Sequence, residues 1–112
     1  MQLKDLLKKL EANIEHVEFE EVMAVISDNY RYSPCSFNNG KLINDAGKNE
    51  GSCKIFAFAK LHGLSEQATL GCFGRYYRED VLLKPLADDH GNIRNFIKSG
   101  WQGIVFNGVA LS

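Results

Sequence analysis

The sequence lacks any long hydrophobic segment, which excludes a membrane-spanning helix. No apolar run exceeds five residues, as in Ile55–Ala59, whereas a transmembrane helix needs roughly 20. Charged residues interrupt the apolar ones throughout the first ten positions, unlike the continuous apolar segment of a secretory signal peptide. We therefore expect neither a membrane protein nor a protein exported by the general secretory pathway.

An excess of charge of either sign is also lacking. The chain has 13 Lys and Arg against 14 Asp and Glu, which gives a formal net charge of −1. Nucleic acids and anionic membranes attract proteins largely through positive charge. We therefore expect neither of them as a partner.

Cysteine is scarce, and its spacing excludes the common zinc and dithiol motifs. The three cysteines are Cys35, Cys53 and Cys72, and no two of them form a Cys-x-x-Cys pair. We interpret them as reduced thiols in a reducing compartment. A metal site without cysteines could be formed by Asp80, Asp88, Asp89 and His90. Acidic turns of this kind more often cap helices, so we expect no metal and no cofactor.

The overall composition, with 45% hydrophobic and 24% charged residues, is that of one globular domain over residues 1–112. Helical spacing of apolar residues predicts helices over about 3–17 and 19–30, with a bend near residues 15–18. Two serines, an aspartate pair and two glycines mark the ends of three further helices. Ser52 and Gly63 bound a helix of about 53–62, Ser65 caps a helix that runs through Tyr77, and Asp88 or Asp89 caps a last helix that Gly100 ends.

Turn residues predict a small sheet between and after these helices. Asn39-Gly40 and Asn107-Gly108 each lie between short β-compatible runs, a strong hairpin signal. The prediction is an α+β fold, with α/β as the alternative class, in which four to five helices surround a small antiparallel sheet built from two β-hairpins. Gly71 and Gly74 lie inside a predicted helix, where they indicate close approach of another backbone.

Cys53 is the leading candidate for a catalytic nucleophile. It is expected in the first turn of a helix, where unpaired N–H groups and the helix dipole lower a thiol pKa. Gly51-Ser52-Cys53 resembles, over three residues only, the sequence around the thiol of papain-like proteases. His90 is the candidate base, with Asp89 to orient it. The alternatives are a small buried core cysteine and a solvated capping turn.

A second set of residues favours binding over catalysis. Asn44, Asn49 and Ser52 lie in the polar loop before the helix of Cys53, which is where we expect a pocket. Arg78 and Arg94 could hold a phosphate or carboxylate, or else form internal ion pairs. Trp101 either anchors the core over the sheet or lines the pocket.

Several of these segments together resemble the HopJ type III effector family. They are Phe37–Gly40, Asn44–Lys54, Cys72–Val81, Asp89–Arg94 and Gly100–Gly103, and the resemblance extends to Leu111. It implies a small single-domain bacterial α/β or α+β protein in a family named for type III secretion in plant pathogens. It implies no reaction and no catalytic residues.

Two functional hypotheses follow. The first is a binding or interaction module with a polar pocket near Cys53, whose partner is a small molecule or a host or bacterial protein. The second is a thiol-dependent hydrolase or transferase with Cys53 as nucleophile and His90 as base.

We expect a monomer or weak homodimer. The family implies secretion by a type III system, whereas a helix predicted from Leu3 favours residence in the bacterial cytoplasm, because type III signals are usually flexible.

Overall fold

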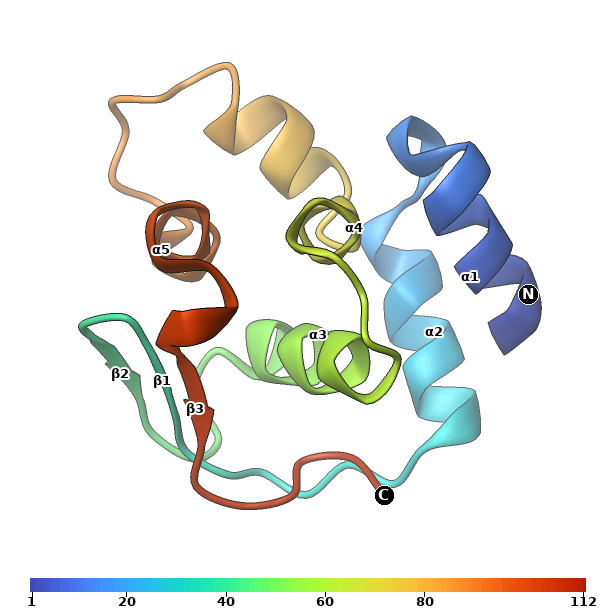
Figure 1. The fold of residues 1–112 in the computed structure, drawn as a ribbon, viewed down its shortest axis with the longest axis horizontal. Helices are drawn as coiled ribbons and strands as arrows, with labels where there is room; N and C mark the ends of the chain where they lie inside the picture. The colour runs from blue at the N-terminus through green and yellow to red at the C-terminus, as the bar shows by residue number, and fades with distance from the viewer.

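The computed structural model describes all residues, 1–112, and confirms an α+β fold. Helices α1 (Leu3–Ala12) and α2 (Phe19–Asn29) lie side by side at one end of the molecule, with a short 3₁₀ helix, η1 (Ile14–His16), between them (Figure 1). The predicted bend is confirmed, because the chain is extended at Val17 and Glu18. None of the helices is long and apolar enough to cross a membrane.

A glycine and an arginine far along the chain hold this bend. Gly74 has a φ of +60°, and a Cβ atom placed there would lie 2.7 Å from the backbone nitrogen of Phe19. The Arg78 guanidinium donates a hydrogen bond of 2.7 Å to the carbonyl oxygen of Val17. The close backbone approach predicted at Gly74 is therefore confirmed.

Helix α3 (Glu50–Leu61) supplies much of the core, because its residues from Ile55 to Ala59 are all buried. It begins three residues earlier than predicted, and Asn49 rather than Ser52 is the residue before it. Asn49 takes a left-handed backbone conformation, which lets the helix start inside the polar loop. The predicted end is confirmed, since Gly63 has a φ of +59° and the Leu64 N–H bonds to the Ala59 carbonyl oxygen.

The second half of the chain contains a short helix, a π-helical segment and a final helix. They are α4 (Glu66–Gly71), η2 (Tyr76–Val81) and α5 (Gly91–Ser99), followed by the 3₁₀ turn η3 (Gly100–Gly103). The single helix predicted from Ser65 to Tyr77 is wrong, because positive φ at Gly74 breaks it. The predicted aspartate cap of the last helix is also wrong, because His90 is the residue before α5.

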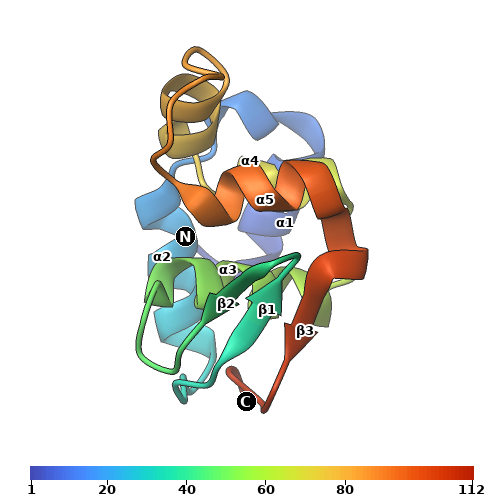
Figure 2. The ribbon, with the colours of Figure 1, turned by 90° about the vertical axis from the view of Figure 1, so that its left-hand side faces the viewer.

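Three short antiparallel strands form the sheet, in the order β2-β1-β3 (Figure 2). The strands are β1 (Phe37–Asn39), β2 (Leu42–Asn44) and β3 (Ile104–Phe106). The first hairpin is confirmed, but the second is wrong. β3 pairs with β1, in a register that stacks Phe37 on Phe106 with ring centroids 5.2 Å apart. The chain then leaves the sheet, and only Leu111 pairs again, with Tyr32.

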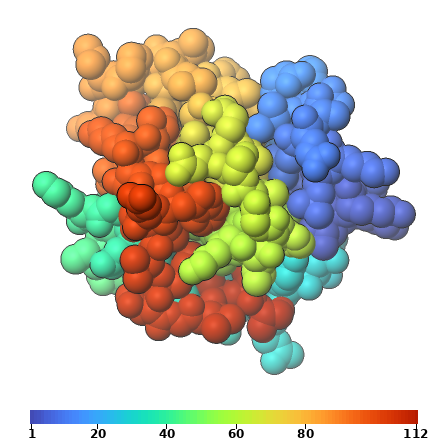
Figure 3. Space-filling view, viewed as in Figure 1, coloured from blue at the N-terminus to red at the C-terminus, as the bar shows by residue number.

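The sheet, α3 and α5 pack around a common aromatic core. Phe56 of α3 lies at its centre, with ring centroids 6.0 Å from Phe37, 5.0 Å from Phe96 and 5.6 Å from Phe73. In the space-filling view the segment around α4 fills the space between the N-terminal helices and the C-terminal part of the chain (Figure 3). The starts of α3 and α5 are thereby brought together from positions about 40 residues apart.

Candidate functional site

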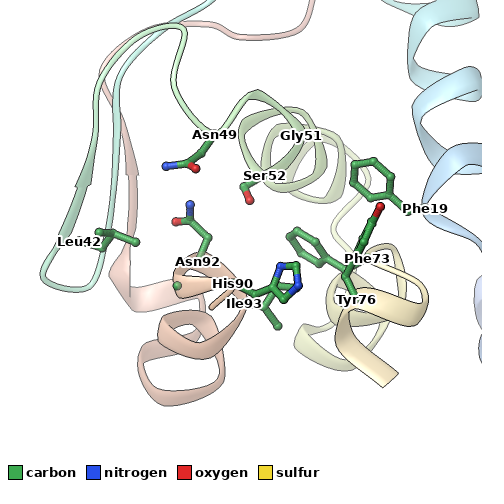
Figure 4. Close-up of a pocket in the computed structure, with 11 residues that line it drawn as sticks. Phe19, Leu42, Asn49, Gly51, Ser52, Phe73, Tyr76, His90, Asn92 and Ile93 are labelled. Atoms are coloured by element: carbon green, nitrogen blue, oxygen red, sulfur yellow. The ribbon is translucent and has the colours of Figure 1, made fainter. Parts of the chain in front are cut away.

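A cavity of about 650 Å³ lies where α3 and α5 begin (Figure 4). Its polar side is formed by Asn49 and Ser52 from the start of α3 and by His90 and Asn92 from the start of α5. Its apolar wall comprises Phe19, Leu42, Phe73, Tyr76 and Ile93. The cavity therefore combines polar side chains and helix starts on one side with aromatic and aliphatic surface on the other.

Both helices begin beside this cavity with unbonded backbone N–H groups. The N–H groups of the first three residues of each helix, 50–52 in α3 and 91–93 in α5, bond to no protein atom. Neither Asn49 nor His90 caps its helix with its side chain. The partial positive charge of two helix dipoles is therefore left exposed at one place.

The backbone conformation of the two residues that precede these helices is unusual. Asn49 and His90 both have a φ of 51°, and they are the only non-glycine residues of the chain with positive φ. Side chains disfavour this region, and strain of this kind concentrates at functional sites. Both residues line the cavity.

Four asparagines tie the hairpin to the two helix starts. The Asn44 side-chain oxygen accepts hydrogen bonds from Asn49 Nδ2 (2.7 Å) and Asn92 Nδ2 (2.9 Å). Asn92 Oδ1 accepts in return from Asn44 Nδ2 (3.1 Å) and Asn39 Nδ2 (3.0 Å). Asn39, Asn44 and Asn92 are all buried. This network holds Asn49 and Asn92 at fixed positions on the polar side of the cavity.

Sequence reasoning placed Asn44 and Asn49 at the pocket but missed Asn39 and Asn92. The sequence predicts a place in the hairpin turn for Asn39, and no motif singles out Asn92. The one available signal was the density of asparagine around the hairpin, which exceeds what a two-residue turn requires.

His90 is oriented by Asp80. The imidazole Nε2 lies 3.0 Å from Asp80 Oδ2 and 3.8 Å from Asp89 Oδ2, and the ring packs 5.3 Å from that of Tyr76. Asp89 is engaged by Arg94 at 2.8 Å, and this hydrogen bond holds the pKa of the Asp89 carboxyl below its ordinary value. The carboxylate that bonds His90 is thus Asp80, which the sequence suggested only as a metal ligand.

Cys53 faces the core instead of the cavity. Its side chain is 1% exposed, and its sulfur lies 3.8 Å from the carbonyl oxygen of Cys35. Burial raises the pKa of the Cys53 thiol to about 11, the opposite of the expected effect of the helix start. No hydrogen bond joins Cys53 to His90. The catalytic role of Cys53 stays a prediction, and this placement disfavours it.

Three other candidate residues use their donors inside the protein. Arg78 bonds the Val17 carbonyl and pairs with Glu18, and Arg94 donates to carbonyl oxygens of the loop between η2 and α5. Trp101 Nε1 donates to the Leu64 carbonyl oxygen at 3.1 Å. None of the three lines the cavity. No group of three or more His, Cys, Asp and Glu side chains is arranged to hold a metal ion.

Comparison with known proteins gives the family. The model of the HopJ type III effector protein family matches residues 3–111. The chain belongs to this family. A solved structure, described as the crystal structure of the unknown function protein VPA0580, shares 55% sequence identity with this chain, with a TM-score of 0.98. It aligns over 100% of this chain and 93% of its own. No curated protein matches the chain.

Proposed function

We propose that this HopJ family protein is a small-ligand-binding module and that the cavity between the starts of α3 and α5 is its binding site. The observation that carries the proposal is the convergence of two uncapped helix starts on one cavity. Both of the chain's non-glycine residues with positive φ lie there, which supports a site maintained for something other than stability.

The lining supports a particular class of ligand. The N–H groups of residues 50–52 and 91–93, together with the Ser52 hydroxyl, are hydrogen-bond donors without protein acceptors. A carboxylate, a phosphate or a carbonyl oxygen would accept these bonds. The apolar wall, with Phe73 and Tyr76, suits an aryl or short aliphatic group attached to that acceptor.

The test is a titration of isotope-labelled protein with phenyl phosphate, followed by NMR. We expect saturable shifts of the amide signals of residues 50–52 and 91–93, and weaker binding of inorganic phosphate, which lacks the aryl group. Ser52→Phe should abolish binding by filling the cavity, whereas Ser27→Phe, at an exposed position of α2, should leave it unchanged. Shifts confined to surface lysines would overturn the proposal.

A second variant covers the case in which Ser52→Phe does not fold. A Cβ atom at Gly91 would lie 3.6 Å from the Leu42 side chain, an ordinary contact, so Gly91→Ala should fold. It narrows the cavity by one methyl group next to the first free N–H of α5. We expect Gly91→Ala to weaken phenyl phosphate binding while the unfolding midpoint stays close to that of the wild type.

We further propose that the protein resides in the bacterial cytoplasm, with delivery by a type III system as the alternative that the family name supports. The test is to measure the protein in culture medium of a strain with and without an active type III apparatus. Release only with the active apparatus would support delivery and overturn residence.

A further inference from the structure

Two residues with complementary chemistry, Ser52 and His90, line the cavity, and a third, Asp80, is bonded to His90. Ser52 comes from the first turn of α3, His90 precedes α5, and Asp80 lies in η2. His90 Nε2 is bonded to Asp80 Oδ2 at 3.0 Å, and the other ring nitrogen, Nδ1, has no protein partner. In Figure 4 a ring nitrogen of His90 faces the cavity on the side of Ser52. A base oriented by a carboxylate thus lies across the cavity from a hydroxyl group.

The Ser52 hydroxyl is available to a ligand in the cavity. It makes no hydrogen bond in the protein, and Figure 4 shows it pointing into the cavity. The serine that does cap a helix, Ser65, accepts a bond of 3.0 Å from the Ala68 N–H. Ser52 and His90 are not hydrogen-bonded to each other. In many enzymes this bond forms only when substrate is bound.

The start of α3 also supplies donors for a developing negative charge. The N–H groups of Gly51 and Ser52 are unbonded and lie at the positive end of the helix dipole, beside the Ser52 side chain. Fixed donors of this kind stabilise the oxyanion of a tetrahedral intermediate. A nucleophile, a base and oxyanion donors therefore line one cavity, and the carboxylate of Asp80 is bonded to the base.

We propose that this site hydrolyses small carboxylic esters, with Ser52 as nucleophile, His90 as base and Asp80 as the residue that positions His90. The proposed hydrolysis rests on the proposed binding function of the same cavity. The Ser52 oxygen bonds to the ester carbonyl carbon while its proton moves to His90 Nδ1. The bond to the alcohol oxygen then breaks, and His90 passes the proton to the leaving alcohol. Water attacks the acyl-serine with His90 as base, which releases the acid and restores the Ser52 hydroxyl.

The walls of the cavity indicate the class of ester. Phe73, Tyr76 and Ile93 offer an apolar surface opposite the polar helix starts. The volume of about 650 Å³ accommodates a small molecule. Aryl esters and short aliphatic esters therefore fit the site, with the carbonyl oxygen toward the helix starts and the apolar group against this wall.

The direct test uses the wild-type protein and needs no variant. A fluorophosphonate probe reacts with activated serines, and peptide mass spectrometry locates the adduct. We expect one adduct, on Ser52, formed faster than any adduct on Ser27 or Ser33, both of which are exposed. Competition by phenyl phosphate should slow the labelling. Absence of an adduct on Ser52 overturns the inference.

Hydrolysis of p-nitrophenyl acetate separates the roles of the three residues. Ser52→Ala and His90→Gln should each lower kcat/KM by about 100-fold or more, since a positioned base contributes 10²–10⁴. Asp80→Asn should lower kcat with little change in KM, and Asp80→Glu should restore part of it. The controls Ser27→Ala and Asp88→Asn, at exposed positions, should keep wild-type rates. Equal rates for Ser52→Ala and wild type would overturn the inference.

The phenyl phosphate titration and the labelling of Ser52 together distinguish the proposed esterase activity from the proposed binding function. Saturable binding of phenyl phosphate without a Ser52 adduct would leave a binding module that has no esterase activity. An absence of binding at residues 50–52 and 91–93 would remove the binding function, and any Ser52 adduct would then reflect the reactivity of the hydroxyl alone.

Discussion

Helix α4 begins at a capped residue, whereas α3 and α5 begin without a cap. Ser65 has an extended backbone, and its hydroxyl accepts the Ala68 N–H at 3.0 Å. Asn49 and His90 instead have left-handed backbones, and their side chains turn away to Asn44 and Asp80. The capped start does not line the cavity that the two uncapped starts share. The side chain of Ser65 thus satisfies a donor of its own helix, whereas the side chains of Asn49 and His90 bond elsewhere and leave the first N–H groups of α3 and α5 unbonded.

The uncapped starts depend on the asparagine network, and breaking it should have the largest effect. Asn92→Ala removes hydrogen-bond partners of Asn39 and Asn44, which are buried and cannot bond to water instead. We expect a loss of about 2–4 kcal/mol in the free energy of unfolding. Urea denaturation measures it. Asn95→Ala, in the same helix but without side-chain hydrogen bonds, is the control, with a change of about 0.5 kcal/mol or less.

The reactivity of Cys53 tests whether a helix start alone activates a side chain. With a pKa of about 11 against an ordinary value of 9.0, its thiolate fraction at neutral pH is about 100-fold below that of a free thiol. We expect negligible alkylation of Cys53 at pH 7 in a Cys35→Ser, Cys72→Ser variant. Labelling should rise only as the pH approaches 11 or as urea unfolds the protein. Rapid labelling at pH 7, slowed by His90→Ala, would restore the thiol-enzyme hypothesis.

The capped start of α4 shows how much a helix cap contributes to the stability of this protein. Ser65→Ala removes the acceptor of the Ala68 N–H and should cost about 1 kcal/mol. Ser27→Ala, at an exposed position inside α2, should cost nothing because alanine is the better helix former. Thermal or urea unfolding compares the two. Ligand binding and ester hydrolysis should be unchanged in Ser65→Ala, and a loss of either would weaken the contrast between the two kinds of helix start.

The smallest effect on stability is expected at His90. His90→Gly relieves a φ of 51° but loses the bond to Asp80, and these contributions should offset to within about 0.5 kcal/mol. Ester hydrolysis should nevertheless be lost. Circular dichroism melts and p-nitrophenyl acetate rates measure the two quantities. A loss of stability above 2 kcal/mol would show instead that the imidazole is a structural residue.

Local signals in the sequence predicted those elements whose residues interact with near neighbours. Gly63 and Ser65 bound their helices as expected, and the first hairpin forms around Gly40. The second hairpin did not form, because Ile104–Phe106 found a partner in β1, about 65 residues away, where Phe106 stacks on Phe37. A turn signal predicts only that the chain can reverse, and the packing of distant side chains decides which strand pairs.

For the candidate site, too, local signals in the sequence predicted one part and contacts between distant segments decided the other. The sequence identified the polar loop, Asn44, Asn49, Ser52 and His90, because asparagine, serine and histidine near helix starts carry local information about hydrogen bonding. It could not show that Cys53 points into the core while Ser52, one residue earlier, points into the cavity. Because α3 begins at Glu50, both residues lie inside the helix, where adjacent side chains are about 100° apart around the axis.

By itself, the sequence determined the family, the α+β class, most helix ends and the chemical types of residue near the site, since these depend on composition and short-range bonding. Only the tertiary structure decided that Asp80 rather than Asp89 bonds His90 and that two helix starts share a cavity. It also decided that Asn39 and Asn92 complete the network. The physical reason is that these contacts join segments far apart in the chain, and the burial of the aromatic core brings them together.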